Sequence, residues 1–172
     1  MHFSNIIAVL SLATASLAAP TAQSQKRADV LTFRPYNDFQ ISDGVAGNAL
    51  AEVNAAFPVD LTNPASVSAN DLAILVAARQ TSENAETAFN SAVSAASGTA
   101  ADALQVGKIK NKVLKLRTFE MQVTVQIAQG ATDKNASLTD IQTKLAANVK
   151  LDQAANGDAS QSVSFTADVQ PQ

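Results

Sequence analysis

The hydrophobic residues between positions 100 and 128 recur at the period of an α-helix and fall on two sides of it. One arc consists of Val106, Ile109, Val113, Leu116, Val123 and Ile127. A second apolar strip, nearly opposite the first, consists of Leu114, Met121 and Val125. A helix on the surface of a domain carries one apolar stripe, whereas a helix with two stripes is packed on two sides. The pattern therefore predicts a central helix that ends at Gly130 and has neighbours on both sides.

Three further stretches have apolar residues at helical spacing, and each begins with a serine that can cap a helix. They are residues 42–57, 68–96 and 137–155. The expected N-caps are Ser42, Ser68 and Ser137. The last two serines are followed three residues later by an aspartate, as in a capping box. Because the connections between the four predicted helices are short, we expect an all-α fold, a four-helix up-down bundle.

The two ends of the predicted domain do not follow the helical period. Residues 28–39 should form an extended N-terminal arm, since Pro35 prevents a helix across them. The C-terminal tail, residues 158–172, is polar, and its apolar positions alternate at Val163, Phe165 and Val169. Alternation of this kind is a weak strand signal. Two alternatives stay open for the tail: it pairs with residues 30–33 of the arm, or it is a disordered end.

The first 27 residues carry targeting and processing signals. Residues 6–17 form an apolar run that is too short to span a bilayer and is followed by small residues. We therefore expect a signal peptide, residues 1–18, that is cleaved after Ala18. The dibasic pair Lys26-Arg27 then predicts a short pro-segment, residues 19–27, removed by a kexin-type protease, although the pair could also be two solvated charges. Residues 28–172 would form a single helical domain, secreted and either extracellular or associated with the cell wall.

The composition argues against several classes of function. Cysteine is absent, and the single histidine is His2, which lies in the predicted leader. Catalysis by histidine or cysteine and zinc binding are therefore not expected in the mature chain, and we predict a non-enzyme without a cofactor. The 15 Asp and Glu outnumber the 12 Lys and Arg, which argues against nucleic-acid binding. We expect a monomer without a transmembrane segment.

Five basic residues are concentrated within ten positions of the predicted central helix. They are Lys108, Lys110, Lys112, Lys115 and Arg117. Their side chains could snorkel beside a buried apolar stripe, form a patch for an anionic partner, or mark a helix that lies on a membrane surface. Glu120 lies inside the apolar arc, where a carboxylate is costly unless it is paired. Arg117, three residues earlier, is the expected partner of Glu120.

One short motif predicts a covalent modification. Asn135-Ala136-Ser137 is an acceptor sequence for N-glycosylation, which we expect in the loop before the last helix. An unused acceptor is the alternative. The same region does not form a calcium loop, because Leu138 and Lys144 stand where a glycine and a glutamate are needed.

Two longer stretches resemble a family of small secreted proteins of filamentous ascomycete fungi. Residues 33–53 read FRPYNDFQISDGVAGNALAEV, and residues 104–116 read LQVGKIKNKVLKL. The resemblance covers residues 31–169. It implies secretion by a fungus and a candidate effector, and it transfers no activity, cofactor or catalytic residue. In composition alone, the cysteine-free chain rich in Ala, Ser and Thr is also similar to the fungal hydrophobic-surface-binding cell-wall mannoproteins.

Taken together, these features predict a secreted protein that acts by binding and not by catalysis. The first hypothesis is an interaction protein at the fungal surface or the host interface, such as an effector, with a protein or polysaccharide partner. The second is a carrier or surface-binder for apolar ligands or cell-wall material. An apolar internal cavity would favour a carrier, and an exposed apolar strip would favour a surface-binder. A polar surface with a basic patch would favour the binding of a partner.

Overall fold

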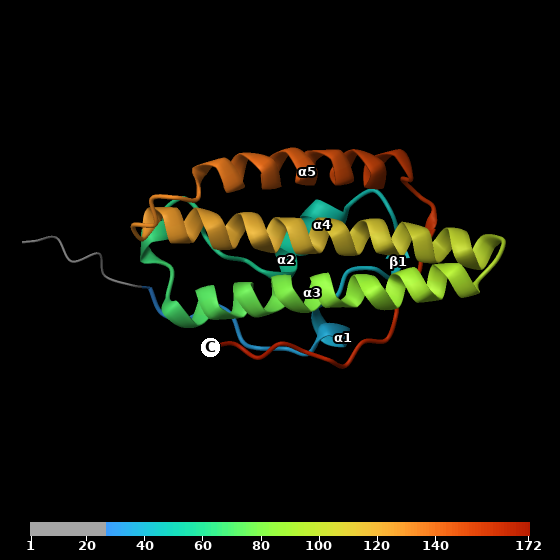
Figure 1. Cartoon of the computed structure of the whole chain (residues 1–172), viewed down its shortest axis with the longest axis horizontal. Coiled ribbons are helices and arrows are strands. Elements are labelled where there is room, and N and C mark those ends of the chain that lie inside the picture. The colour runs from blue at the N-terminus through green and yellow to red at the C-terminus, as the bar shows by residue number, and fades with distance from the viewer. Residues whose placement is uncertain (1–26) are drawn as a thin grey trace, which may run out of the picture.

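The structure is a computed structural model that describes residues 27–172, so the predicted signal peptide, Ala18 and Lys26 lie outside the described residues. The helices of the described part are α1 (Tyr36–Phe39), α2 (Ala49–Ala56), η1 (Pro64–Ser66), α3 (Ala69–Ala95), α4 (Thr99–Ala128) and α5 (Asn135–Ala154). Its strands are β1 (Gly44–Val45) and β2 (Ala159–Ser160). The predicted all-α class, with a helical bundle and a C-terminal tail, is confirmed (Figure 1). The N-terminal arm is extended only as far as Pro35, so the predicted extension to Phe39 is wrong: Pro35 precedes the first turn of α1, where its fixed φ is compatible with a helix start.

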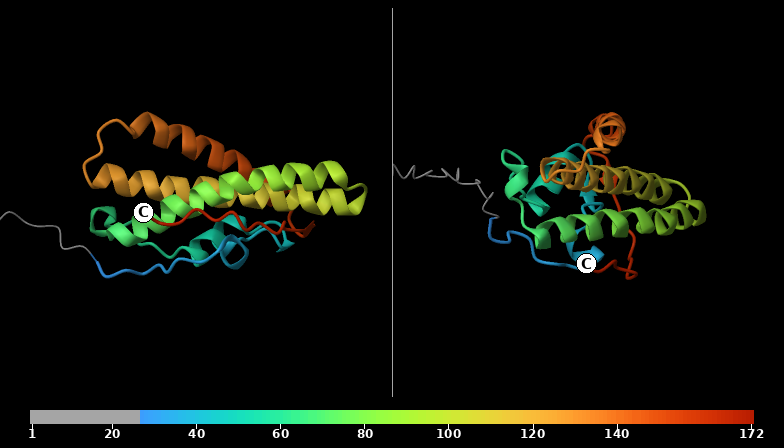
Figure 2. Two further views of the ribbon diagram at one scale, coloured as in Figure 1. Left: turned by 60° about the horizontal axis from the view of Figure 1, so that its bottom comes forward. Right: turned by 60° about the vertical axis from the view of Figure 1, so that its left-hand side comes forward.

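Helix α4 is the centre of the bundle, as the two apolar strips predicted. It lies between α3 and α5, and it also contacts α2 (Figures 1 and 2). Val113 of the first strip and Leu114 and Val125 of the second are fully buried. Both sides of α4 are therefore covered, which is the reason for its unusual apolar pattern.

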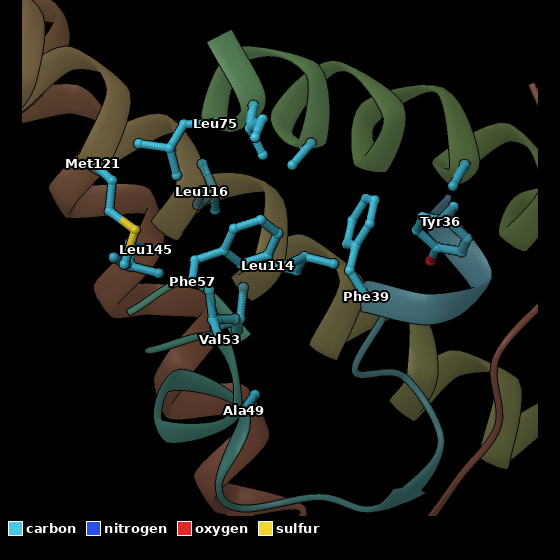
Figure 3. Close-up of a cluster of buried hydrophobic side chains, with 14 of the residues drawn as sticks. Tyr36, Phe39, Ala49, Val53, Phe57, Leu75, Leu114, Leu116, Met121 and Leu145 are labelled. Carbon is cyan, nitrogen blue, oxygen red and sulfur yellow. The ribbon is translucent and has the colours of Figure 1, made fainter. Parts of the chain in front are cut away.

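The core is completed by aromatic side chains from the segment that precedes α3. Figure 3 shows Phe39 of α1 and Phe57, which follows α2, directed toward Leu114 of α4. The rings of Phe39 and Phe57 meet edge to face with centroids 5.6 Å apart, and Tyr36 meets Phe39 in the same way at 5.6 Å. Aromatic pairs of this geometry contribute about 0.5–1.5 kcal/mol beyond the area they bury.

The first predicted helix begins later than expected. Helix α2 starts at Ala49, and the prediction that Ser42 is its N-cap is wrong. Gly44 and Gly47 both have positive φ, and the chain between them forms strand β1 instead of a helical turn. Asp152 of α5 takes over the capping role, because its carboxylate accepts the N–H groups of Gly47 at 3.0 Å and Ala49 at 2.9 Å.

The cap of α3 is confirmed, but its aspartate does not complete a capping box. Ser68 Oγ accepts the N–H of Asp71 at 3.0 Å, as predicted. The Asp71 carboxylate accepts the N–H groups of Val30 and Leu31 in the arm rather than that of Ser68. A cap that looked local in the sequence therefore also fastens the N-terminal arm to the bundle.

Helix α5 begins before its predicted cap. The helix starts at Asn135, so the prediction that Ser137 is the N-cap is wrong. The reason is that Lys134 already has helical backbone angles, with φ −105° and ψ −3°. Ser137 consequently lies within the first turn of α5.

The C-terminal tail is an ordered strap, and its strand partner is not the one expected. β2 pairs antiparallel with β1, with Gly44 opposite Ser160, instead of pairing with residues 30–33. The tail then runs beneath α3 beside α1 (Figures 1 and 2). Asp168 accepts the N–H of Tyr36 at 2.6 Å, and the N–H of Val169 donates to Thr81 Oγ1 at 2.9 Å. The disordered alternative is therefore not the one adopted.

Candidate functional site

Lys110 does not belong to a surface patch. Its side chain is fully buried, and its Nζ lies 2.8 Å from Glu52 Oε2. The ammonium also donates to the backbone oxygens of Asp43 and Val45, each at 3.0 Å. The prediction that Lys110 belongs to a patch for an anionic partner is thus wrong. Its ammonium is buried and is paired with Glu52 and with two backbone oxygens at the beginning of β1.

Two further members of the basic cluster are neutralised by carboxylates. Lys115 Nζ lies 2.6 Å from Glu86 Oε1 on α3. Arg117 Nη1 lies 2.6 Å from Glu120 Oε2, which confirms the expected pair. All four side chains are mostly shielded from water. The Lys115–Glu86 pair therefore links α4 to α3, whereas the Arg117–Glu120 pair lies within α4. Neither positive charge is available as a field for an anionic ligand.

Only Lys108 and Lys112 are left from the predicted patch. Both are half-buried, and neither makes an ion pair with any residue from 27 to 172. Two half-buried ammonium groups on an acidic protein are a weak basis for an anionic partner. Within the same range, no helix combines the length and hydrophobicity needed to cross a membrane.

The predicted modification sites are placed as follows. Asn135 is exposed at the first residue of α5, so it does not lie in the preceding loop as expected. Ser137, the third residue of the acceptor sequence, is exposed as well. Arg27 is exposed at the start of the described chain. Glycosylation of Asn135 stays a prediction.

A polar network crosses the interior between α1, α3 and α4. The Tyr36 hydroxyl donates to Asn111 Oδ1 at 2.8 Å, and Asn111 Nδ2 donates to the backbone oxygen of Ser82 at 2.9 Å. Burial raises the pKa of the Tyr36 phenol above its usual value, so the group stays protonated and keeps this bond. Tyr36, Asn111 and Ser82 are all fully buried. The network thus serves to fix α1 against the bundle, because a ligand has no access to it.

A groove of about 510 Å³ lies where α3 begins, α4 ends and the tail passes. It is lined by Ala69, Leu72, Ala73, Val76, Gln80, Gln126, Gln129, Val169, Gln170 and Gln172. We call this hollow the glutamine groove. The end of the tail lies below the first turns of α3 in Figure 1. The strap therefore supplies one wall, and the two longest helices supply the others.

The glutamine groove combines apolar side chains with amides and contains no ionisable side chain. Leu72 and Val76, one turn apart on α3, are half-exposed and provide the apolar surface. Gln129 is held by a bond from its Nε2 to the backbone oxygen of Val67 at 2.9 Å. Gln126 Oε1 is buried and accepts no hydrogen bond from residues 27–172. The arrangement can bind an uncharged ligand that has apolar groups and hydrogen-bonding amides.

A pattern of polar residues in the sequence corresponds to part of this groove, but an analysis of the apolar residues alone does not detect it. Gln122, Gln126 and Gln129 are spaced by four and three residues, so they form one polar stripe near the end of α4. Leu72 and Val76 follow the helical spacing of apolar residues within 68–96, yet they remain half-exposed. Nothing local to the sequence indicated that the tail would return to this place.

A second groove of about 510 Å³ lies at the beginning of α4 beside β2. Its lining includes two carboxylates, Asp102 and Asp158. Within residues 27–172, no group of three or more His, Cys, Asp or Glu side chains is arranged to hold a metal ion. The second groove therefore offers open acidic surface, whereas the glutamine groove offers a defined mixture of apolar and amide groups.

Comparison with known proteins gives one match. A family model described as Domain of unknown function (DUF8454) matches residues 31–164, which include α1 to α5 and both strands. No curated protein and no solved structure matches the chain.

Proposed function

We propose a binding function for this chain, which belongs to the DUF8454 family. The protein is a secreted, monomeric and non-catalytic interaction protein that acts at the fungal surface or the host interface. The observation that carries the proposal is that none of the side chains lining the glutamine groove is ionisable. Its partner is another protein, of which an extended segment without charged side chains lies in the groove.

The chemistry of the groove supports a peptide segment as the ligand. A glutamine amide both donates and accepts hydrogen bonds, and it therefore complements the N–H and C=O groups of an extended backbone. Leu72 and Val76 would receive the apolar side chains of that segment. An ionic group on the ligand would lose its water without gaining a partner of opposite charge, which is costly. The volume of about 510 Å³ is in the range of about 300–1,000 Å³ typical of ligand sites.

The same lining favours a protein over the polysaccharide that we also considered. Sugar rings commonly stack on aromatic side chains, and none of the ten residues of the groove is aromatic. A carrier of apolar ligands is the second candidate function, because Leu72 and Val76 would also accept an alkyl chain. The two candidates differ in their need for the glutamines: an alkyl chain gains nothing from them.

The proposal is tested by nuclear magnetic resonance with short capped peptides that lack charged residues. We expect these peptides to shift the backbone signals of Leu72, Val76 and Gln126. The variant Val76→Glu places an unpaired carboxylate in the groove and should weaken binding at least about tenfold, equivalent to about 1.4 kcal/mol. The matched control is Val93→Glu, since Val93 is also half-exposed on α3 but lies outside the groove.

Three probes separate the candidates. Peptides of the same length that carry Asp or Lys should bind more weakly than the uncharged ones. An uncharged detergent with an octyl chain should leave the glutamine signals in place, and detergent binding without peptide binding would replace the proposal by the carrier function. Equal loss of peptide binding in Val76→Glu and Val93→Glu would show that the groove is not the site.

A further inference from the structure

The sequence contains a dibasic pair that the binding function does not use, and its second residue, Arg27, is the first residue that the structure describes. Lys26-Arg27 is the one place in the sequence where two of the 12 Lys and Arg are adjacent. Proteases of the subtilisin-like class that cut after dibasic pairs require the basic side chains to enter their own pockets. Whether such a protease can act on the folded protein therefore depends on how Arg27 is held.

Arg27 is held by two polar contacts at the surface. Its Nη1 lies 2.5 Å from Asp60 Oδ2, and the two side chains are 43% and 42% exposed. Its backbone N–H donates to the oxygen of Ser66 at 2.7 Å. An ion pair this exposed contributes little to stability. The contacts restrain Arg27, but a protease can remove it from them without unfolding the bundle.

Hydrogen bonds from Thr62 favour the ionised form of the Asp60 carboxylate, which contacts Arg27. Its Oδ1 accepts the hydroxyl of Thr62 at 2.7 Å and the N–H of the same residue at 2.8 Å. These two bonds, followed by the contact with Arg27, lower the pKa of Asp60 to about 2. The carboxylate is therefore ionised at any pH at which a secreted protein works.

The chain becomes firmly anchored only a few residues later. The N–H of Leu31 donates to Asp71 Oδ1 at 2.8 Å, and the N–H of Val30 donates to the same carboxylate at 3.1 Å. Asp71 is buried, and the Leu31 side chain belongs to the core. Residues 27–29, in contrast, are exposed. The anchored part of the chain thus begins at Val30, three residues after Arg27.

We propose that the Arg27–Ala28 peptide bond is cut in the folded protein by a dibasic-specific, subtilisin-like endoprotease, and that Asp60 slows this cut by holding the Arg27 guanidinium. The reaction is a hydrolysis. Water adds its oxygen to the carbonyl carbon of Arg27, the C–N bond breaks, and the Ala28 nitrogen leaves as a protonated amine. The anchor at Asp71 is untouched, so the domain that begins at Ala28 keeps its fold. This processing is independent of the glutamine groove.

The test uses the purified full chain, incubated with a dibasic-specific subtilisin-like endoprotease and followed by intact-mass spectrometry. We expect a single cut after Arg27 and no further trimming. Asp60→Asn removes the charge of the restraining carboxylate and should accelerate the cut by up to about fivefold, the equivalent of an exposed ion pair. Asp133→Asn is the matched control, because Asp133 is exposed and makes no ion pair with residues 27–172, and it should leave the rate unchanged.

Circular dichroism before and after the cut completes the test. The product should melt at the same temperature as the uncut chain, whereas a large drop would show that the domain needs the residues before Ala28. Resistance of the folded chain at Arg27, or a first cut elsewhere, would overturn the processing site. Equal rates for Asp60→Asn and the wild type, or equal acceleration in Asp60→Asn and Asp133→Asn, would overturn the role of Asp60.

Discussion

Replacing Lys110 by methionine gives the sharpest test of the difference between a surface patch and a structural charge. Methionine keeps most of the length and apolar character of the lysine stem but removes the ammonium. That ammonium contacts Glu52 and the backbone oxygens of Asp43 and Val45. The variant therefore removes one buried ion pair and two hydrogen bonds at the point where α4 meets the turn before β1.

The cost follows from the burial of the two partners. Removing one member of a buried ion pair costs about 3–5 kcal/mol, because the other charge is left without compensation. The Glu52 side chain is 36% exposed and can recover water, so we expect a lower value, about 2–3 kcal/mol. For a domain of this size, the melting temperature should fall by about 5–10 °C. This is a large part of the usual stability of about 5–15 kcal/mol.

The measurement is urea unfolding followed by circular dichroism, with Lys112→Met as the matched control. Lys112 lies two residues away on α4, carries the same charge and is half-buried without an ion pair to residues 27–172. Its replacement should change the stability by no more than about 0.5 kcal/mol. With a urea dependence of about 2 kcal/mol per molar, Lys110→Met should lower the midpoint by about 1 M.

Unfolding of both variants at the same urea concentration as the wild type would contradict a structural role for the Lys110 charge. Such a result would mean that the Lys110 ammonium is hydrated in solution and available to a partner, which would return Lys110 to the basic patch beside Lys108 and Lys112. A change in the slope of the transition in Lys110→Met alone would point to a different effect, a loosened native state.

Three further outcomes are expected. Gly107→Ala should destabilise the fold by about 1–3 kcal/mol in urea, because the new Cβ would lie 1.9 Å from the Gln161 backbone oxygen and displace the tail; an unchanged midpoint would contradict the close packing. Gly130→Val should cost about 1 kcal/mol in the same assay, since φ is +108° and the cost is backbone strain alone. Burial raises the pKa of Asp43, but hydrogen bonds from Ser162 outweigh it and leave the pKa lowered. Asp43→Asn should therefore lower the free energy of unfolding at neutral pH, and the difference from the wild type should disappear as the pH falls below about 4. Urea titrations at several pH values would show this.

The sequence alone predicted the two longest helices well. The two apolar strips of residues 100–128 identified α4 as a central helix, and Ser68 marked the beginning of α3. These features are local: a helix places residues three and four apart on one face whatever its neighbours are, and a serine cap bonds within its own turn. Arg117 and Glu120 were paired correctly for the same reason.

The polar and glycine positions were decided by residues far along the chain. Residues 42–48 follow a helical spacing, but Asp152 caps α2 from the other end of the domain and the tail pairs with β1. In the sequence, Lys110 belongs to a run of basic residues; in the structure, its ammonium is paired with Glu52. A sequence pattern can show that a buried charge needs a partner, but it does not show which distant residue the fold places beside that charge.

The candidate groove depends on the tertiary structure in the same way. The glutamine stripe near the end of α4 is visible in the sequence, yet a stripe becomes a site only when other elements enclose it. That enclosure requires α3 beside α4 and the tail folded back beneath α3. The sequence alone was enough to locate the two longest helices, α3 and α4, because the hydrogen bonds of a helix are local. Which polar groups are buried, paired or open to a ligand follows only from the tertiary structure, because those outcomes depend on contacts between distant segments, such as Tyr36 and Asp168, 132 positions apart.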